Sequence, residues 1–340
     1  MSNVFFNTAA EKTIEADAAT LHSWTFHKRL PEYARTPLRQ APKSAKRLGV
    51  AHAWVKDESH RLGLPAFKVL GASWAAYRLI ERRLGITLDE WETFDELKAV
   101  LRDLGDVTFV TATDGNHGRA VARVASWFGL RSRIFMPAGT VRERIEAIES
   151  EGAVVSVVDG DYDAAVAAAA ALQGPDRWLI QDTGWPGYET VPAWIVEGYS
   201  TIFFELEEQF ESYGIGTVDR VAVQIGVGSL AAAVAVFYRG GRSRYTPRII
   251  GVEPNDAACA FESVQSGGMI TVPGPHESVM AGLNCGTVSS VAWPYLASGI
   301  DTFVTVPNGR AFEAMRLLAH DAIVSGESGA AGLAGLIELA

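Results

Sequence analysis

Lys68 is the residue of this chain with the clearest potential for chemistry. It stands between Phe67 and a run of small and apolar residues, and a helical pattern follows through Trp74, Tyr77 and Ile80. Burying an ammonium group is costly, so an apolar setting lowers the pKa of a lysine. Such a lysine is a nucleophile that can form a Schiff base with a carbonyl group. The alternative is an ordinary helix lysine whose stem is buried and whose amine reaches water.

A polar turn, Asp114-Gly115-Asn116-His117-Gly118, follows a β-rich run at 107–111 and opens a helical pattern. It places a carboxylate, an amide and an imidazole within four positions. Asn116 can donate a hydrogen bond to a phenolate-like oxygen. Asp114 could instead be a helix N-cap, and His117 a polar helix residue whose hydrogen bonds are satisfied.

A second turn, Gly226-Val227-Gly228-Ser229-Leu230, lies between a predicted strand and the start of a predicted helix. Glycines let backbone N–H groups point toward one place, where the helix dipole favours an anion. The P-loop pattern is absent because no Gly-Lys-Ser/Thr follows, and Ala231 breaks the dinucleotide fingerprint. The turn is therefore either a phosphate site or a plain tight turn. A reactive lysine, a phosphate site and a donor to a ring oxygen together describe a pocket for pyridoxal 5′-phosphate (PLP).

The elements that must position these residues alternate between strands and helices, which predicts parallel βαβ units in an α/β protein. In such folds ligands gather at the carboxyl ends of strands, so we expect the two turns and Lys68 to converge. Strands are predicted at 53–57, 107–111, 133–136, 153–158, 178–181, 220–225, 248–252 and 301–306. Helices are predicted at 118–128, 141–150, 162–172, 195–211, 230–238, 257–265, 309–320 and 328–339.

Length and composition bound the class of protein. A chain of 340 residues predicts about two domains, and 48% hydrophobic with 21% charged residues is typical of a globular protein. The net charge of −10 argues against nucleic-acid or anionic-membrane binding. The first residues show no secretory signal, and apolar runs such as 164–172 are too short to span a bilayer. We expect a soluble cytoplasmic protein.

Cys259 and Cys285 do not have the Cys/His spacing of a zinc site. Both flank one Gly/Pro-rich segment, so two free thiols and a disulfide across a loop are both open readings.

The order of lysine, Gly-Asn-His-Gly turn and glycine-rich turn resembles the fold-type II (tryptophan-synthase-like) PLP enzymes over nearly the whole chain. Within that group the motifs are similar to those of the diaminopropionate ammonia-lyases. The discriminating residue is Asp114, where serine and threonine dehydratases and cysteine synthases usually place Ser. The motifs that carry this resemblance are Lys56-Asp57-Glu58-Ser59, Ala66-Phe67-Lys68, 113–118, Gln181-Asp182-Thr183 with Trp185 and Gly187-Tyr188, 280–286 and 326–330.

The resemblance implies a role for each candidate site residue. Lys68 would form the Schiff base with PLP, and Asn116 would contact the hydroxyl of the ring. The turn from Gly226 through Val227, Gly228 and Ser229 to Leu230 would hold the phosphate. Asp114 would be a substrate-facing carboxylate and base, and Asp182 a second carboxylate near the substrate. The resemblance assigns His117 no firm role, and it favours a disulfide between the two cysteines, since the family has cysteines at both positions.

The resemblance also implies an architecture of two open, mostly parallel α/β domains with the cofactor in the cleft. We expect residues 69–191 to form a smaller, mobile domain, and residues 1–68 with 192–340 a larger PLP-binding one. A homodimer is expected on family grounds. The family's late strand, whose Ser or Thr faces the pyridine nitrogen, has no predicted counterpart, because 328–339 has a helical pattern. We therefore assign no partner to that nitrogen.

The resemblance implies α,β-elimination of ammonia from 2,3-diaminopropionate, a small amino acid, giving pyruvate and a second ammonia. Lys68 and Asp114, as two bases on opposite faces, would let both substrate enantiomers react. A carboxylate also suits a β-ammonium group better than a β-hydroxyl group. The alternatives are a serine/threonine dehydratase or amino-acid racemase on the same fold, or an inactive PLP-fold protein with a binding or regulatory role.

Overall fold

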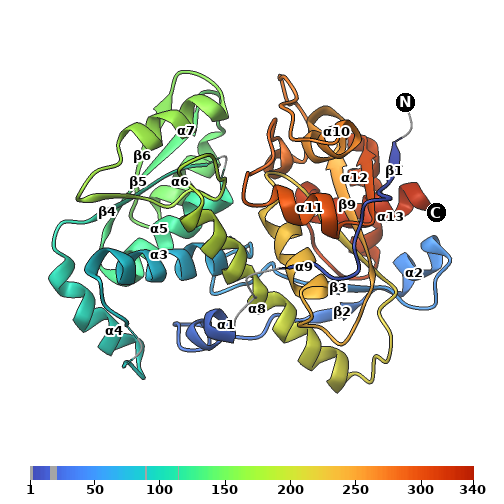
Figure 1. Ribbon diagram of the computed structural model, residues 1–340, viewed down its shortest axis with the longest axis horizontal. Helices are drawn as coiled ribbons and strands as arrows, with labels where there is room; N and C mark the ends of the chain where they lie inside the picture. The colour runs from blue at the N-terminus through green and yellow to red at the C-terminus, as the bar shows by residue number, and fades with distance from the viewer. Residues whose placement is uncertain (1–2, 16–20, 89, 114) are drawn as a thin grey trace.

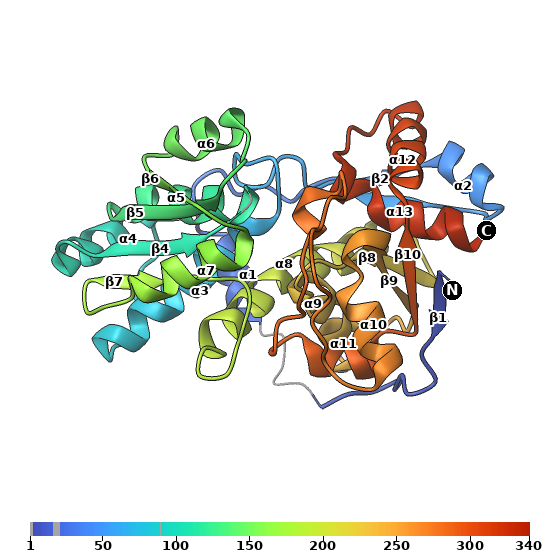
Figure 2. The ribbon, with the colours of Figure 1, turned by 90° about the horizontal axis from the view of Figure 1, so that it is seen from above.

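The computed structural model describes residues 3–15, 21–88, 90–113 and 115–340, which form two lobes joined by a long helix (Figure 1). Asp114 lies outside the described residues. Each lobe is built on an open sheet of four strands, and the cavity described below lies between the lobes. Figure 2 shows the same two lobes from above.

The sheet of the first lobe has the strand order β6-β5-β4-β7, and all of its strands are parallel. Neighbouring residues of β4 point to opposite faces, so Phe109 packs into the core shared with α5 whereas Val110 packs into the cluster that includes α7. The elements of this lobe are β4 (Thr108–Ala112), β5 (Arg131–Pro137), β6 (Val154–Val158), β7 (Arg177–Leu179), α3 (Lys68–Leu84), α4 (Phe94–Leu101), η1 (Arg102–Leu104), α5 (Asn116–Phe128), α6 (Arg142–Glu149) and α7 (Tyr162–Ala171).

The sheet of the second lobe has the order β1-β10-β9-β8, parallel except for the antiparallel edge strand β1. A small antiparallel pair, β2 and β3, lies in the same lobe. The elements are β1 (Val4–Phe6), β2 (Leu38–Gln40), α2 (Pro42–Leu48), β3 (Trp54–Lys56), β8 (Arg220–Gln224), α9 (Ser229–Arg239), β9 (Arg248–Pro254), η2 (Asn255–Ala257), α10 (Cys259–Ser266), η3 (Ala281–Leu283), α11 (Trp293–Gly299), β10 (Thr302–Val306), α12 (Asn308–His320) and α13 (Glu327–Leu339).

The helix α8 (Thr190–Ser212) joins the two lobes and packs on α3, on α9 and on α1 (Leu21–His27). Two glycines let α8 approach α3 closely. A Cβ atom on Gly198 would lie 2.6 Å from the carbonyl oxygen of Leu70, and one on Gly71 would lie 2.7 Å from Ile195 and Tyr199. The close contact fixes the start of α3, and therefore Lys68, relative to α8.

The α/β architecture with two mostly parallel sheets agrees with the prediction from sequence, and each predicted strand and helix is present with ends shifted by a few residues. The prediction missed β1, β2, α2, α4 and α11. Four of these five elements have seven residues or fewer, and a short segment carries little periodicity. In the described part of the chain, no helix is both long enough and apolar enough to cross a membrane.

Candidate active site

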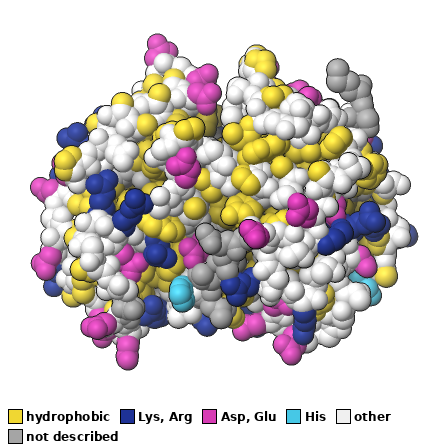
Figure 3. Space-filling view, viewed as in Figure 1, with side chains coloured by type: hydrophobic (Ala, Val, Ile, Leu, Met, Phe, Trp, Pro, Cys, Tyr) yellow, Lys and Arg dark blue, Asp and Glu magenta, His cyan; other side chains and the backbone are white. Residues whose placement is uncertain are grey.

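A cavity of about 1800 Å³ lies between the two lobes. Figure 3 shows a furrow between the lobes with hydrophobic side chains gathered beside it. Most of the residues singled out in the sequence line this cavity, although they come from four separate segments: Lys68, Asn116, His117, Asp182 and the turn 226–230. The convergence expected from the strand ends is therefore present.

Lys68 is the first residue of α3, and its amine reaches into the cavity. Its Nζ donates a hydrogen bond of 2.6 Å to Oδ2 of Asp182. About a quarter of the Lys68 side chain is exposed, whereas only 6% of Asp182 is. The ring of the preceding residue, Phe67, packs edge-on against Tyr199 of α8. A largely enclosed amine beside a buried carboxylate is a setting that can control the proton of the nucleophile.

Asp182 follows the end of β7, and its charge is stabilised although the residue is buried. Burial alone would raise the pKa of this carboxyl group. Attraction to His117, when that ring is protonated, and to Lys68 reverses the effect and lowers the pKa of Asp182 to about 2. Asp182 is therefore an anion at neutral pH, and Lys68 is the cation bonded to it.

The turn from Gly226 to Leu230 forms a cradle at the start of α9. Gly228 has a φ of +97°, and a Cβ atom there would lie 2.9 Å from Leu296. A Cβ atom on Gly226 would lie 3.0 Å from the carbonyl oxygen of Gly282. Gly228 therefore has to be glycine and Gly226 leaves little room for a side chain, so the backbone at the start of α9 lines the cavity without side chains at these two positions. The cradle fits a phosphate group.

The hydroxyl group of Ser229 ties the cradle to the lysine site. Its Oγ donates a hydrogen bond of 2.8 Å to the carbonyl oxygen of Asp182. Two residues further on, the N–H group of Gly184 donates to Oγ of Ser289, whose own N–H group donates to the carbonyl oxygen of Val227. The glycine turn and the Asp182 segment are thus held together by hydrogen bonds on both sides.

Asn116 is the first residue of α5 and lines the cavity on the side of the first lobe. Thr113 shapes the turn before it, because its Oγ1 accepts a hydrogen bond from the N–H group of Gly115. Gly118 is required two residues later, since a Cβ atom there would lie 2.3 Å from Thr113. The site thus combines an amine, an amide and an anion cradle in one cavity, the groups needed to hold the carbonyl, the ring oxygen and the phosphate of PLP.

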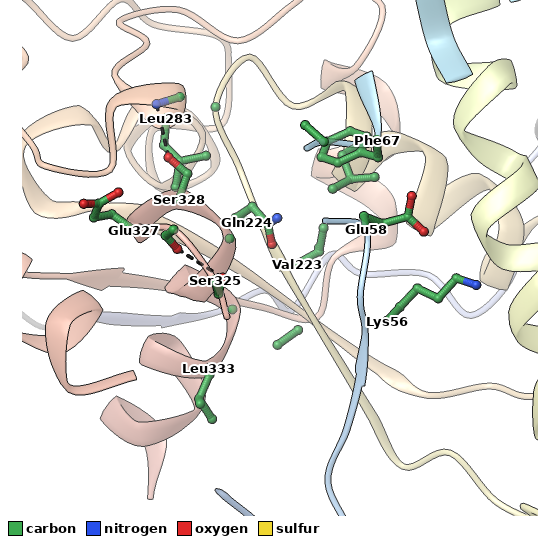
Figure 4. A pocket seen from close by; sticks show the side chains of 18 of the residues that line it. Lys56, Glu58, Phe67, Val223, Gln224, Leu283, Ser325, Glu327, Ser328 and Leu333 are labelled. Carbon is green, nitrogen blue, oxygen red and sulfur yellow. Dashed lines mark hydrogen bonds between the residues drawn. The ribbon is translucent and has the colours of Figure 1, made fainter. Parts of the chain in front are cut away.

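The far side of the cavity is formed by the second lobe. Figure 4 shows Val223 and Gln224 of β8 between Phe67 and Glu58 on one side and Ser325 and Ser328 on the other. Oγ of Ser328 accepts a hydrogen bond from the N–H group of Gly282, which joins the start of α13 to the η3 segment.

Cys259 and Cys285 are not joined by a disulfide, and both lie beside Gly226 of the cradle. Sγ of Cys259 donates to the carbonyl oxygen of Gly226 at 3.8 Å, and a Cβ atom on Gly226 would lie 3.4 Å from Sγ of Cys285. Burial raises the pKa of the Cys259 thiol, so this group stays protonated. The structure therefore has two thiols and not the disulfide that the resemblance favoured.

Sequence reasoning missed two features of the site. It placed Asp182 near the substrate but did not pair it with Lys68, and it gave His117 no partner, although Nδ1 of His117 lies 3.8 Å from Oδ2 of Asp182. A signal for the first feature existed. β7 pairs with β4 in parallel. Asp182, which follows β7, and the 113–118 turn, which follows β4, therefore belong to the same edge of the sheet.

Comparison with known proteins agrees with this chemistry. A family model described as pyridoxal-phosphate dependent enzyme matches residues 30–340. Diaminopropionate ammonia-lyase of Salmonella typhimurium is 37% identical over 325 residues, which cover 92% of this chain and 80% of the relative. The Escherichia coli (strain K12) enzyme of that name is 36% identical over 337 residues, 97% of this chain and 83% of the relative.

A crystal structure of diaminopropionate ammonia-lyase from Escherichia coli in complex with D-serine superimposes with a TM-score of 0.89 at 34% identity, covering 98% of this chain and 85% of that one. Fold, site and similarity over nearly the whole chain therefore coincide. The chain belongs to the pyridoxal-phosphate-dependent enzymes, and within them to the diaminopropionate ammonia-lyase family.

Proposed function

We propose that this protein eliminates ammonia from 2,3-diaminopropionate and releases an aminoacrylate that hydrolyses to pyruvate and a second ammonia. The observation that carries the proposal is the pairing of Lys68 with the buried Asp182 at 2.6 Å, in one cavity with the glycine cradle. The relatives that match most of the chain have the same named activity.

Each of these residues would have its own role in binding PLP and in the reaction. The 226–230 turn would bind the phosphate, Asn116 would donate to the ring oxygen, and Lys68 would offer its amine to the carbonyl carbon. PLP, when bound, supplies an electron sink for the charge left on the α-carbon. Lys68 would take the α-proton of the substrate, and Asp182 holds its amine in place.

Asp114 is the residue we propose as the second base and as the partner of the β-ammonium group. This assignment comes from the sequence, because Asp114 lies outside the described residues. A carboxylate attracts an ammonium leaving group. It can also take the α-proton from one face of the substrate, while Lys68 takes it from the opposite face. Replacing Asp114 by Ser should therefore lower turnover of diaminopropionate more than turnover of serine.

Pyruvate release tests the proposal. Purified protein with PLP should form pyruvate and ammonia from diaminopropionate with a higher kcat/KM than from serine or threonine. The Lys68→Ala variant should lose both the activity and the near-visible absorbance band that borohydride removes. A protein that binds PLP and consumes serine but not diaminopropionate would instead be a dehydratase. One that binds PLP and converts none of these amino acids would have a binding or regulatory role.

We also propose an organisation for the whole enzyme. Residues 69–191 would move as a smaller domain against 1–68 with 192–340, which bind PLP, and closure over the substrate would exclude water. The first boundary falls at the start of α3 and the second lies within α8, at the contact between the lobes. We further propose a homodimer in the cytoplasm, for which light scattering of the purified protein is the direct measurement.

A further inference from the structure

A third polar group, His117, lies beside the pair formed by Lys68 and Asp182. Its ring is on the first turn of α5 and is almost fully buried. Nε2 lies 2.8 Å from the carbonyl oxygen of Ile180. A carbonyl oxygen can only accept, so Nε2 carries a hydrogen atom. In the neutral ring, Nδ1 is then a lone-pair acceptor.

Nδ1 of His117 has no hydrogen-bond partner among the described residues, and it lies 3.8 Å from Oδ2 of Asp182. This is the oxygen to which Lys68 donates. One carboxylate oxygen thus faces two nitrogen atoms that can carry a proton. An orphaned buried acceptor beside a carboxylate is an arrangement that becomes favourable only when a proton arrives at Nδ1.

A single buried carboxylate compensates one neighbouring positive charge, and a second cation at the same place would stay uncompensated. Burial lowers the pKa of His117, the charge of Lys68 lowers it further, and the charge of Asp182 opposes both effects. While Lys68 is an ammonium group, His117 is therefore neutral. When Lys68 loses its proton, the repulsion that kept His117 neutral is gone and the attraction to Asp182 remains.

The groups that face His117 or its two charged neighbours come from three elements. Asp182 follows β7, Lys68 begins α3, and Tyr199 of α8 faces the same pair with a pKa that burial raises, so its hydroxyl group stays neutral. On α5 itself, the nearby Arg119 is paired with Glu151 and is therefore compensated elsewhere. The charge on His117 is thus controlled by Lys68 and Asp182.

We infer that Nδ1 of His117 holds the proton that Lys68 gives up when its amine acts as a nucleophile, with Oδ2 of Asp182 as the partner that both nitrogens share. The proton leaves Nζ, passes along Oδ2 and ends on Nδ1. The ammonium group becomes an amine, the imidazole becomes an imidazolium, and the carboxylate is unchanged. The inference rests on the proposed function for the need to deprotonate Lys68. His117 acts through Asp182 and is therefore a positioning residue.

Two variants of Lys68 test this without reference to turnover. Lys68→Met removes the positive charge and Lys68→Arg keeps it, while neither side chain can bond covalently to PLP. The chain has seven histidines, so ¹⁵N NMR of histidine-labelled protein can follow each ring, with His117→Gln to assign the signal. We expect the titration midpoint of His117 to be at least about one pH unit higher in the Met variant than in the Arg variant.

His27 is the internal control, because it is buried like His117 but lies near Arg61 and Glu205 instead of Asp182. Its signal should be the same in both variants. Adding Asp182→Asn to Lys68→Met should return His117 to the neutral form. Equal midpoints for His117 in the Met and Arg variants would overturn the inference, while the proposed function would still be decided by pyruvate release.

A second measurement applies if Lys68→Met does not fold. His117→Gln keeps a donor for the carbonyl oxygen of Ile180 but lacks the Nδ1 acceptor. Lys68 must then keep its proton to higher pH. The rate at which added PLP reacts with the protein, followed by near-visible absorbance, should shift by at least about one pH unit toward alkaline pH. His27→Gln should leave this profile in place, and an unshifted profile for His117→Gln would contradict the inference.

Discussion

Asp182 shows at the scale of single residues how burial and charge together determine reactivity. Burial opposes its charge, yet attraction to His117, when that ring is protonated, and to Lys68 keeps it ionised. The bond to Lys68 also stabilises the ammonium form of the lysine. Removing the negative charge should make Lys68 easier to deprotonate.

We therefore expect Asp182→Asn to move the pH profile for the reaction of PLP with Lys68 toward acid pH by about one unit or more. The profile can be measured from the absorbance of the bound cofactor. Asp163→Asn is the matched control, because Asp163 is an exposed carboxylate on the wall of the same cavity. An unchanged profile for Asp182→Asn, or an equal shift in the control, would show that the carboxylate does not govern the amine.

At the scale of elements, His27 joins three helices. It lies at the end of α1, its Nδ1 is 2.6 Å from Oγ1 of Thr201 in α8, and its Nε2 is 3.0 Å from the carbonyl oxygen of Leu70 in α3. Burial lowers its pKa to about 3, although the hydrogen bond to Leu70 opposes the shift. The ring is therefore neutral in the folded protein at pH values where it is protonated in the unfolded chain.

This difference gives the stability a defined pH dependence. Below pH 6.5 the unfolded chain binds a proton that the folded protein does not, so His27 should lower the free energy of unfolding by about 1.4 kcal/mol per pH unit down to about pH 3. In His27→Gln, urea unfolding at pH 7, 6 and 5 should show a shallower decline than in the wild type. The exposed His22 is the control, and an equal decline in His27→Gln would contradict the assignment.

The crossing of α3 and α8 depends on Gly198. The new methyl group of Gly198→Ala would meet the backbone of Leu70 and Gly71, which cannot move aside as a side chain could. We expect a loss of about 1–3 kcal/mol in the free energy of unfolding, measured by urea denaturation. Gly309→Ala in α12 should be neutral or stabilising, because nothing lies within 4 Å of its Cβ position. A loss of equal size in both variants, or no loss in Gly198→Ala, would show that the close contact of the two helices does not require this glycine.

The elements also show what the sequence can and cannot predict. The periodicity of 107–181 and 195–306 predicted the four strands of the first sheet and three of the four strands of the second. The parallel order predicted that the turns near Asn116 and Gly228 converge. The edge strand β1 was not predictable, because it has three residues and pairs with β10, about 300 positions away. The close contact at Gly198 likewise depends on a partner helix that no local pattern reveals.

At the scale of the whole molecule, a buried network of charges joins the segment before Lys68 to the helix between the lobes. Arg61 and Glu205 have no exposed side-chain surface, and Arg61 donates to both carboxylate oxygens of Glu205 at 2.6 and 2.8 Å. Lys56 of β3 and Tyr33 donate to the same carboxylate. The residues involved are up to 172 positions apart, so their pairing has no signature in the sequence.

Glu205→Gln should be the most damaging of these changes. It leaves the ammonium of Lys56 without its carboxylate partner and the buried guanidinium of Arg61 with Glu58 alone. Removing one partner of a buried ion pair costs about 3–5 kcal/mol, and Glu58 offsets part of that cost. Glu208, three positions after Glu205 in the same helix, pairs with Arg35 at the surface, with 52% and 44% of the two side chains exposed. Glu208→Gln should therefore change the free energy of unfolding by at most about 1 kcal/mol.

Because the network holds the segment that leads to Lys68, Glu205→Gln should also slow the reaction of PLP with the protein at temperatures where the variant is still folded. Similar unfolding midpoints and similar rates in the two variants would show that the charges of this network do not position the lysine.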